Sequence, residues 1–220
     1  MPFKEPNAIQ LRVTLAEIEP PIWRQLIVPR TFTLGQLHHV IQAAFGWLDY
    51  HLHQFIIGGL RFGDYEQVGE PEFEGDTRAF DETEVRLLDF GFNRDVRFVY
   101  EYDFGDGWEH VVEFEQLLKL DPPPRVARCL GGARARPPED VGGAYGYADF
   151  LEIITDPDHP EHDSMRTWAG GHFDPEWFDL KLVNSDVRAA LTGKRPLRTH
   201  QSAAKARRKG TWLPPADLKQ

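Results

Sequence analysis

Cysteine is nearly absent from this sequence: Cys129 is the only one among 220 residues. A single thiol excludes an internal disulfide framework and is typical of a protein kept in a reducing compartment such as the cytoplasm. The sequence also lacks an apolar run close to the roughly 20 residues that a membrane-spanning helix needs, and its first residues do not form a secretory signal. We therefore expect a cytoplasmic protein with no membrane partner.

The common catalytic signatures are missing as well. The sequence contains no G-x-x-x-x-G-K phosphate loop, no H-E-x-x-H, no G-x-S-x-G and no C-x-x-C. Cys129 could act as a nucleophile only beside a histidine in space, and a buried thiol is the simpler interpretation. Whether the protein is an enzyme stays open at this point.

Positive charge is scarce outside the C-terminus. Residues 194–220 contain eight basic residues and one acidic residue, whereas residues 1–193 carry a net charge of −17. An acidic body disfavours nucleic-acid binding over its whole surface, because phosphate contacts dominate that affinity. The basic tail could contact nucleic acid by itself, lie against the acidic body or extend into solvent. We expect one domain over 1–193 followed by a mobile tail, 194–220.

The N-terminal part of the chain alternates between strand and helix patterns. Residues 8–18 alternate apolar and polar side chains as a half-buried strand does, and 22–28 predict a second strand. Across 33–46 an apolar stripe predicts a helix that ends at a glycine, with Thr33 and Gln36 as a capping box at its start.

Later segments predict further elements. Residues 51–59 predict a strand, 63–80 an acidic loop and 81–91 a short helix. After residue 142 the periodicity becomes helical, in YADFLEIITD, HPEHDSMRTWAGG, DPEWFDL and NSDVRAAL. This order favours an α+β fold with a mainly antiparallel twisted sheet, an early packed helix and a helical C-terminal half.

The stretch YEYDFGDGWEHVVEFE, residues 100–115, predicts a β-hairpin. A three-residue Gly-Asp-Gly loop would pair Phe104 with Trp108 and Tyr102 with His110, which places the aromatic side chains on one face. A one-residue slip would expose that whole apolar set, so burial favours this register.

The same register predicts a crowded acidic face. It places Asp103 directly opposite Glu109, with Asp106 at the tip, and like charges in that position are destabilising. A bound cation or raised carboxyl pKa values would account for the arrangement, and so would side chains that splay into water.

Four long motifs resemble the plasmid pRiA4b ORF-three-like family, often labelled transposon passenger TnpR. In chain order they are PPIWRQLIVPRTFTLGQLHHVIQAAFGWLDYHLHQF, YEYDFGDGWEHVVEFE, PPEDVGGAYGYADFLEIITDPDHPEH and FDPEWFDLKLVN. The resemblance covers about residues 8–186 and implies an α+β fold and a link to mobile elements, but no established activity. Similar proteins often carry more cysteines near PPED, where this chain has Arg136 and Val141, so a thiolate zinc centre is not expected.

The TnpR label suggests a resolvase, and the residues argue against that chemistry. A serine recombinase carries its nucleophile near the N-terminus, yet the first serine is Ser164. A tyrosine recombinase carries its nucleophile late in the chain, and no tyrosine follows Tyr147. Recombinase chemistry is therefore disfavoured.

The preferred hypothesis is a non-enzymatic binding or adaptor module for a protein or small ligand. It uses the hairpin tip, 103–110, and the loop 137–147, which are rich in aromatic and acidic residues, and it requires an exposed Trp108. Its candidate binding residues are Asp103, Asp106, Trp108, Glu109, His110, Glu139, Asp140 and Tyr145.

The alternative hypothesis is a divalent-metal-dependent hydrolase or nuclease, and a divalent ion is the only cofactor implied. Its candidate metal ligands are Asp103, Asp106, Glu109, Glu139 and Asp140. The candidate catalytic residues are His110, as a general base or ligand, and Asp103. This hypothesis requires that the two segments meet in space with converging carboxylates.

Several histidines form a weaker candidate. His51 and His53 lie on one face of a predicted strand and could hold a metal with help from His38 or His39. Partly buried, hydrogen-bonded histidines are the more ordinary interpretation.

Overall fold

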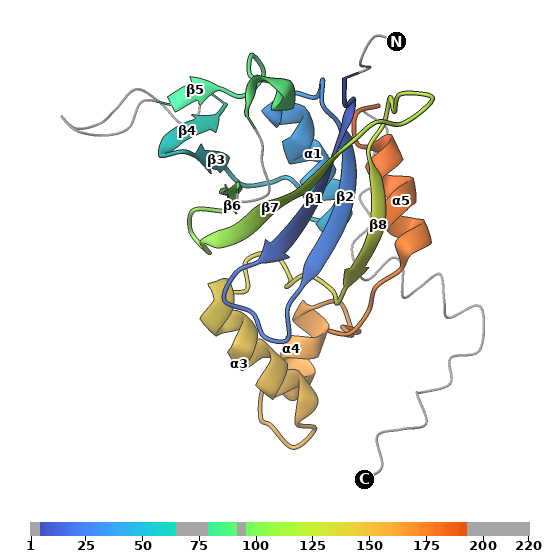
Figure 1. The fold of residues 1–220 in the computed structure, drawn as a ribbon. Coiled ribbons are helices and arrows are strands. Elements are labelled where there is room, and N and C mark those ends of the chain that lie inside the picture. Colours follow the sequence, from blue (N-terminus) through green and yellow to red (C-terminus); the bar gives the residue numbers. More distant parts are fainter. Residues whose placement is uncertain (1–4, 65–78, 92–95, 193–220) are drawn as a thin grey trace, which may run out of the picture.

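The computed structural model describes residues 5–64, 79–91 and 96–192 (Figure 1). Most of the predicted acidic loop and the whole of the predicted tail, 194–220, lie outside these ranges. Within them, no helix has the length and apolar character needed to cross a membrane.

One eight-stranded sheet organises the described chain, with the strand order β5-β4-β3-β6-β7-β1-β2-β8. Its strands are β1 (Ala8–Leu15), β2 (Trp23–Pro29), β3 (His53–Ile57), β4 (Leu60–Gly63), β5 (Ala79–Asp81), β6 (Arg97–Tyr102), β7 (Trp108–Leu118) and β8 (Arg128–Ala133). All neighbouring strands are antiparallel except β4 and β5. The predicted α+β class with a mainly antiparallel sheet is confirmed.

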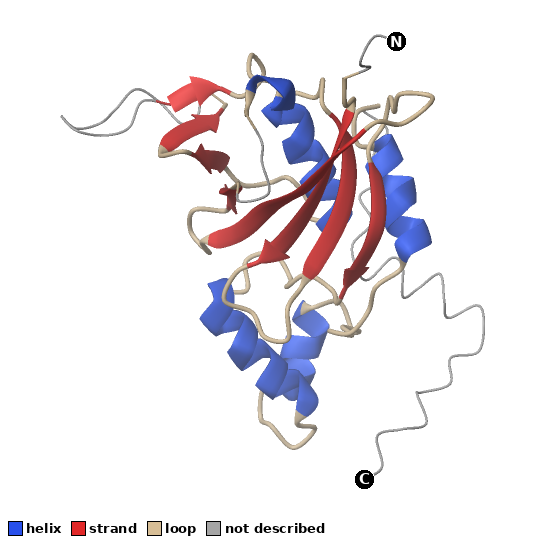
Figure 2. Ribbon diagram, in the orientation of Figure 1, coloured by secondary structure: helices blue, strands red, loops and turns tan. Residues whose placement is uncertain are grey.

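The helices fall into two groups. They are α1 (Leu34–Phe45), the short 3₁₀ helix η1 (Leu87–Asp89), α3 (Gly143–Thr155), α4 (His162–Trp168) and α5 (Leu180–Ala189). Helices α1 and α5 pack against each other and against the sheet at β2 and β8, while α3 and α4 pair beyond one end of the strands (Figures 1 and 2). The core lies between the sheet and α1.

Helix α1 forms where its capping signals predict. Thr33 Oγ1 accepts a hydrogen bond from Gln36 N at 3.2 Å, and Gln36 Oε1 accepts one from Thr33 N at 3.0 Å. Gly46 ends the helix with φ 87°, a left-handed conformation that a residue without Cβ adopts easily. The backbone N–H groups of Thr33 and Gln36, which have no partner within the helix, are thus bonded by side chains three residues away. The start of this helix is therefore determined by local sequence.

The hairpin register differs from the prediction. Strands β6 and β7 pair Tyr102 with Trp108 and Glu101 with Glu109, so the predicted pairing is wrong by two residues. A shift of two residues keeps every side chain on its predicted face, because the side-chain period of a strand is two. The predicted aromatic face is therefore correct and buried for the residues of the ladder. Phe104, predicted to face Trp108, lies in the loop and is 41% exposed, and Asp103 also lies in the loop and not opposite Glu109.

Asp103 explains why the hairpin loop is longer than predicted. Its backbone adopts φ 59°, and its Oδ1 accepts hydrogen bonds from Gly105 N at 3.0 Å and Asp106 N at 3.3 Å. Such an Asx turn ends the ladder before the predicted position. It also leaves the other carboxylate oxygen, Oδ2, available for a neighbour.

Two predicted helices are wrong. Residues 81–91 form a turn, in which Asp81 Oδ1 accepts from Thr83, followed by the 3₁₀ helix η1. In residues 174–179, Asp174 Oδ1 accepts a hydrogen bond from Glu176 N in a turn at Pro175 and Glu176, and α5 begins only after its N-cap, Asp179. Asp81 and Asp174 are residues that favour the start of a helix and equally favour a turn. In both places the side chain accepts a hydrogen bond from the backbone two residues on, and the chain forms a turn.

Arg24 is a buried cation that joins three elements. It is 2% exposed and donates hydrogen bonds to the carbonyl groups of Ala44, Ala133 and Arg134 at 2.8–2.9 Å. Burial lowers the pKa of Arg24 to about 10. The guanidinium therefore fixes the end of β8 and the following segment against α1.

Candidate functional site

The hairpin loop and the segment before α3 meet in space. Asp106 Oδ2 accepts a hydrogen bond from Gly142 N at 3.1 Å. The backbones are so close that a Cβ on Gly143, whose φ is 70°, would lie 2.6 Å from the Asp106 carbonyl oxygen. Gly143 is thus required by the close approach of the two chain segments, whereas Gly142 is favoured by its own positive φ of 92°.

His51 lies where these two segments meet. Its Nε2 is 3.5 Å from Asp103 Oδ2, 3.3 Å from Asp140 Oδ1 and 3.9 Å from Glu139 Oε2. The ligand atoms of His51, Asp103 and Asp140 all lie within 4.8 Å of one another. We call His51, Asp103, Glu139 and Asp140 the His51 cluster.

Two atoms of the His51 cluster are buried and make no hydrogen bond. Within the described part of the chain, neither His51 Nε2 nor Glu139 Oε2 has a hydrogen-bond partner. The Glu139 side chain is only 8% exposed, and burial raises the pKa of its carboxyl group although Arg136 opposes the shift. A buried carboxylate oxygen without a donor is costly, and a cation beside it removes that cost.

The surrounding structure holds the cluster in place. Glu139 Oε1 accepts a hydrogen bond from Leu48 N at 2.7 Å and lies 3.6 Å from Arg136 Nη2. Arg136 is held in turn by Gly46 O and by the face of Trp47. With Oε1 engaged in this way, Oε2 is the oxygen that faces His51.

Both aspartates of the His51 cluster have unusual backbones. Asp103 and Asp140 adopt φ values of 59° and 57°, in the left-handed region that costs a residue with a Cβ about 1 kcal/mol or more. The Asp103 side chain is 10% exposed, whereas that of Asp140 is 70% exposed. The cluster is therefore closed on the Asp103 side and open to solvent at Asp140.

The remaining candidate residues from the sequence lie elsewhere. His110 is fully buried and Trp108 is 2% exposed, so both belong to the core. Glu109 is exposed on β7, and Tyr145 is 88% exposed at the start of α3. Asp106 accepts the hydrogen bond from Gly142 N at the start of α3. It therefore lies beside the His51 cluster, whose members Asp103 and Asp140 belong to the same two segments.

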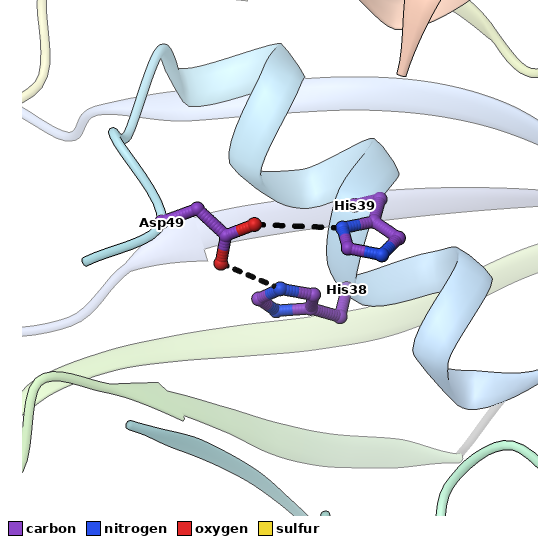
Figure 3. A group of neighbouring side chains, drawn as sticks. All are labelled: His38, His39 and Asp49. Atoms are coloured by element: carbon purple, nitrogen blue, oxygen red, sulfur yellow. Dashed lines mark hydrogen bonds and ion pairs between the residues drawn. The ribbon is translucent and has the colours of Figure 1, made fainter. Parts of the chain in front are cut away.

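A second group of polar residues lies along α1 (Figure 3). Asp49 Oδ1 is 2.8 Å from His38 Nε2, and Asp49 Oδ2 is 3.6 Å from His39 Nδ1. Burial lowers the pKa of His38 to about 4. His53 does not join His51: its ring stacks on that of His38 at 3.5 Å, and its Nε2 lies 2.9 Å from Glu82.

The sequence singled out every member of the His51 cluster, but as two separate candidates. It singled out the three acidic members and, separately, His51 as a possible ligand beside His53. It missed Asp49 and Glu82 altogether, because each lies in a loop with no local pattern that sets it apart. The alternation of the predicted strand placed His51 and His53 on one face. In the structure His51 lies beside Asp103 and Asp140, whereas His53 contacts His38 and Glu82.

The family model for plasmid pRiA4b ORF-3-like proteins matches residues 7–182. The chain belongs to this family. The resemblance drawn from the four motifs is thereby confirmed.

The chain is also similar to two named proteins. The uncharacterised protein y4hQ of Sinorhizobium fredii is 36% identical over 167 residues, which are 74% of this chain and 81% of that protein. The crystal structure of MM3350, a protein of unknown function from Methanosarcina mazei Go1, superposes with a TM-score of 0.70 at 35% identity. That match covers 81% of this chain and 98% of MM3350, so the two proteins share the fold.

Proposed function

We propose that this plasmid pRiA4b ORF-3-like protein is a divalent-metal-dependent hydrolase whose ion binds in the His51 cluster. The observation that carries the proposal is that His51 Nε2 and Glu139 Oε2 are buried, make no hydrogen bond and lie 3.9 Å apart, with the Asp103 and Asp140 carboxylates beside them. An ion between them would also be within reach of Asp103 and Asp140, and it would satisfy both atoms at once.

The composition of the His51 cluster indicates the class of ion. Carboxylate oxygens suit Mg²⁺ and Mn²⁺, and imidazole suits Zn²⁺, Fe²⁺ and Ni²⁺. One imidazole with three carboxylates therefore favours Mn²⁺ or Zn²⁺. When bound, such an ion lowers the pKa of a coordinated water and polarises a substrate oxygen, which is the chemistry of metal-assisted hydrolysis.

A hollow beside the cluster would hold the substrate. Asp140 lines a cavity of about 550 Å³ between α3 and α4, together with Phe150, Met165 and Trp168. Among the described residues that line it, the cavity also has the acidic Asp149 and no basic side chain. This composition supports a small substrate with an apolar part over a nucleic acid, since phosphate backbones are bound through basic groups.

The adaptor hypothesis keeps one supporting observation. Tyr50 and Tyr145 are 63% and 88% exposed, and exposed aromatic side chains are common in binding interfaces. Its main support was an exposed Trp108, and that side chain is 2% exposed. A link to mobile elements remains a prediction from the family resemblance.

A thermal melt of metal-free protein titrated with Mn²⁺, Zn²⁺, Mg²⁺ and Ca²⁺ tests the proposal. An ion that binds the folded state raises the Tm by mass action. We expect a saturable rise with Mn²⁺ or Zn²⁺ that Asp140→Asn removes and Asp149→Asn keeps, because Asp149 lines the cavity without belonging to the cluster. Chromogenic carboxyl ester, amide and phosphate monoester probes then test for hydrolysis.

Two results would contradict this assignment. If Asp140→Asn responds to the ions as the wild type does, the ion does not bind in the His51 cluster. If the ion binds there but no probe is hydrolysed faster than by Asp140→Asn, the ion is structural and the adaptor hypothesis is the better one.

A further inference from the structure

Two consecutive histidines on α1 converge on one carboxylate. His38 Nε2 and His39 Nδ1 lie 2.8 Å and 3.6 Å from the two oxygens of Asp49. Ligand atoms of all three residues lie within 4.8 Å of one another, and Figure 3 shows both rings turned toward the same carboxylate. We propose that His38, His39 and Asp49 form a second divalent-metal site, separate from the His51 cluster.

The His38 ring is also contacted on the side away from Asp49. Its Nδ1 lies 2.8 Å from the Tyr100 hydroxyl group, which also accepts a hydrogen bond from Gln42 Nε2 at 2.9 Å. The ring stacks on His53 with an interplanar angle of 11°. Histidines that bind metals commonly have their second nitrogen fixed by such an outer partner, which orients the ring. A hydroxyl group can donate to Nδ1 or accept from it, so either tautomer of His38 is accommodated.

The other side of the trio is accessible. The His39 side chain is 48% exposed and that of Asp49 is 34% exposed, whereas that of His38 is 3% exposed. An ion can enter past His39 and Asp49, and water can complete its coordination. Three protein ligands with an open position are the usual arrangement where an ion exchanges or meets a further ligand.

The ligand set of this site is richer in nitrogen than that of the His51 cluster. Two imidazole nitrogens and one carboxylate oxygen favour Zn²⁺, Co²⁺, Ni²⁺ or Fe²⁺ over Mg²⁺ and Ca²⁺. None of the three residues belongs to the His51 cluster, so this site does not depend on the proposed hydrolase function.

The competing explanation is that His38, His39 and Asp49 form a hydrogen-bonded network without a metal ion. Substitution of His39 distinguishes this network from a metal site. The bond between His38 and Asp49 persists when His39 is changed to asparagine, so the network predicts no loss from that substitution. A metal site loses a ligand, which typically weakens binding strongly. His39 is half exposed, so His39→Asn is expected to fold.

The test counts Co²⁺ ions bound per chain to metal-free, full-length protein, by equilibrium dialysis and by visible absorption at micromolar Co²⁺. We expect two ions in the wild type, one in His39→Asn, one in Asp140→Asn and two in the control His172→Asn. The absorption band that His39→Asn removes would differ from the band that Asp140→Asn removes.

The outcomes distinguish this site from the His51 cluster. A single ion that His39→Asn removes supports the second site and contradicts the proposed hydrolase site. A single ion that only Asp140→Asn removes overturns the second site and leaves the first intact. Wild-type stoichiometry in His39→Asn also overturns the second site, and so does absence of bound Co²⁺.

Discussion

Trp47 Nε1 donates a hydrogen bond to His110 Nε2 at 3.0 Å in the core of the protein. This bond requires a lone pair on Nε2, so the proton of the neutral ring lies on Nδ1. Nδ1 is 3.2 Å from the carbonyl oxygen of Tyr100 and 3.1 Å from that of Trp108, which accept from it. His110 is therefore a neutral structural residue, and burial lowers its pKa to about 4.

The first prediction concerns stability in acid. Unfolded histidine has a pKa of about 6.5, so between about pH 6.5 and pH 4 the unfolded state binds a proton that folded His110 does not. The free energy of unfolding should fall as the pH drops through this range. Urea denaturation at several pH values measures the slope, which His110→Gln should reduce and the control His172→Gln should not. His38 has a similar shift, so part of the slope should remain in His110→Gln. An unchanged slope would contradict this account of His110.

The second prediction separates stability from metal binding at Glu139. Because burial raises the pKa of this carboxyl group, the uncharged side chain suits the metal-free fold better than the carboxylate does. Glu139→Gln should keep or raise the Tm of the metal-free protein at neutral pH and should abolish the rise caused by Mn²⁺ or Zn²⁺. Thermal melts with and without ion measure both effects. A lower metal-free Tm together with an unchanged ion response would show that Glu139 only pairs with Arg136.

The third prediction compares two glycines with positive φ. Gly107 has φ 67° and open space around its Cβ position, so Gly107→Ala should cost about 1 kcal/mol. Gly143→Ala should cost clearly more, because its Cβ would lie 2.6 Å from the Asp106 carbonyl oxygen and force the two segments apart. It should also weaken ion binding in the His51 cluster. Urea denaturation and ion titration check this, and equal effects of the two variants would refute it.

The fourth prediction concerns Arg24. Arg24→Met leaves the buried carbonyl groups of Ala44 and Arg134 without their donor, and each such group costs about 1–3 kcal/mol. The free energy of unfolding should fall by about 3 kcal/mol or more. Arg12→Met is the control: Arg12 lies over the Trp23 ring on the half-buried side of β1, and its loss should cost about 1 kcal/mol or less. A cost for Arg24→Met as small as that of the control would contradict the role of Arg24.

Local patterns in the sequence were sufficient for several elements. The capping box at Thr33 and the apolar stripe behind it located α1, since both signals act within one turn of the chain. The alternation in the hairpin identified its buried face even though the register was wrong, because a shift of two residues changes no face. An acidic residue such as Asp81 favours both a helix start and a turn, so the sequence alone did not predict which of the two forms there.

By itself the sequence determined the α+β class, the first helix and the aromatic face of the hairpin, because each of these depends on spacing along the chain, and its motifs indicated the family by resemblance. Only the tertiary structure decided which polar residues meet. Asp103 and Asp140 reach His51 because an Asx turn and a pair of glycines bring two distant segments together. His110 has the same residue type as His51 but lies in the core, and the difference comes from packing across the sheet, which no local pattern encodes.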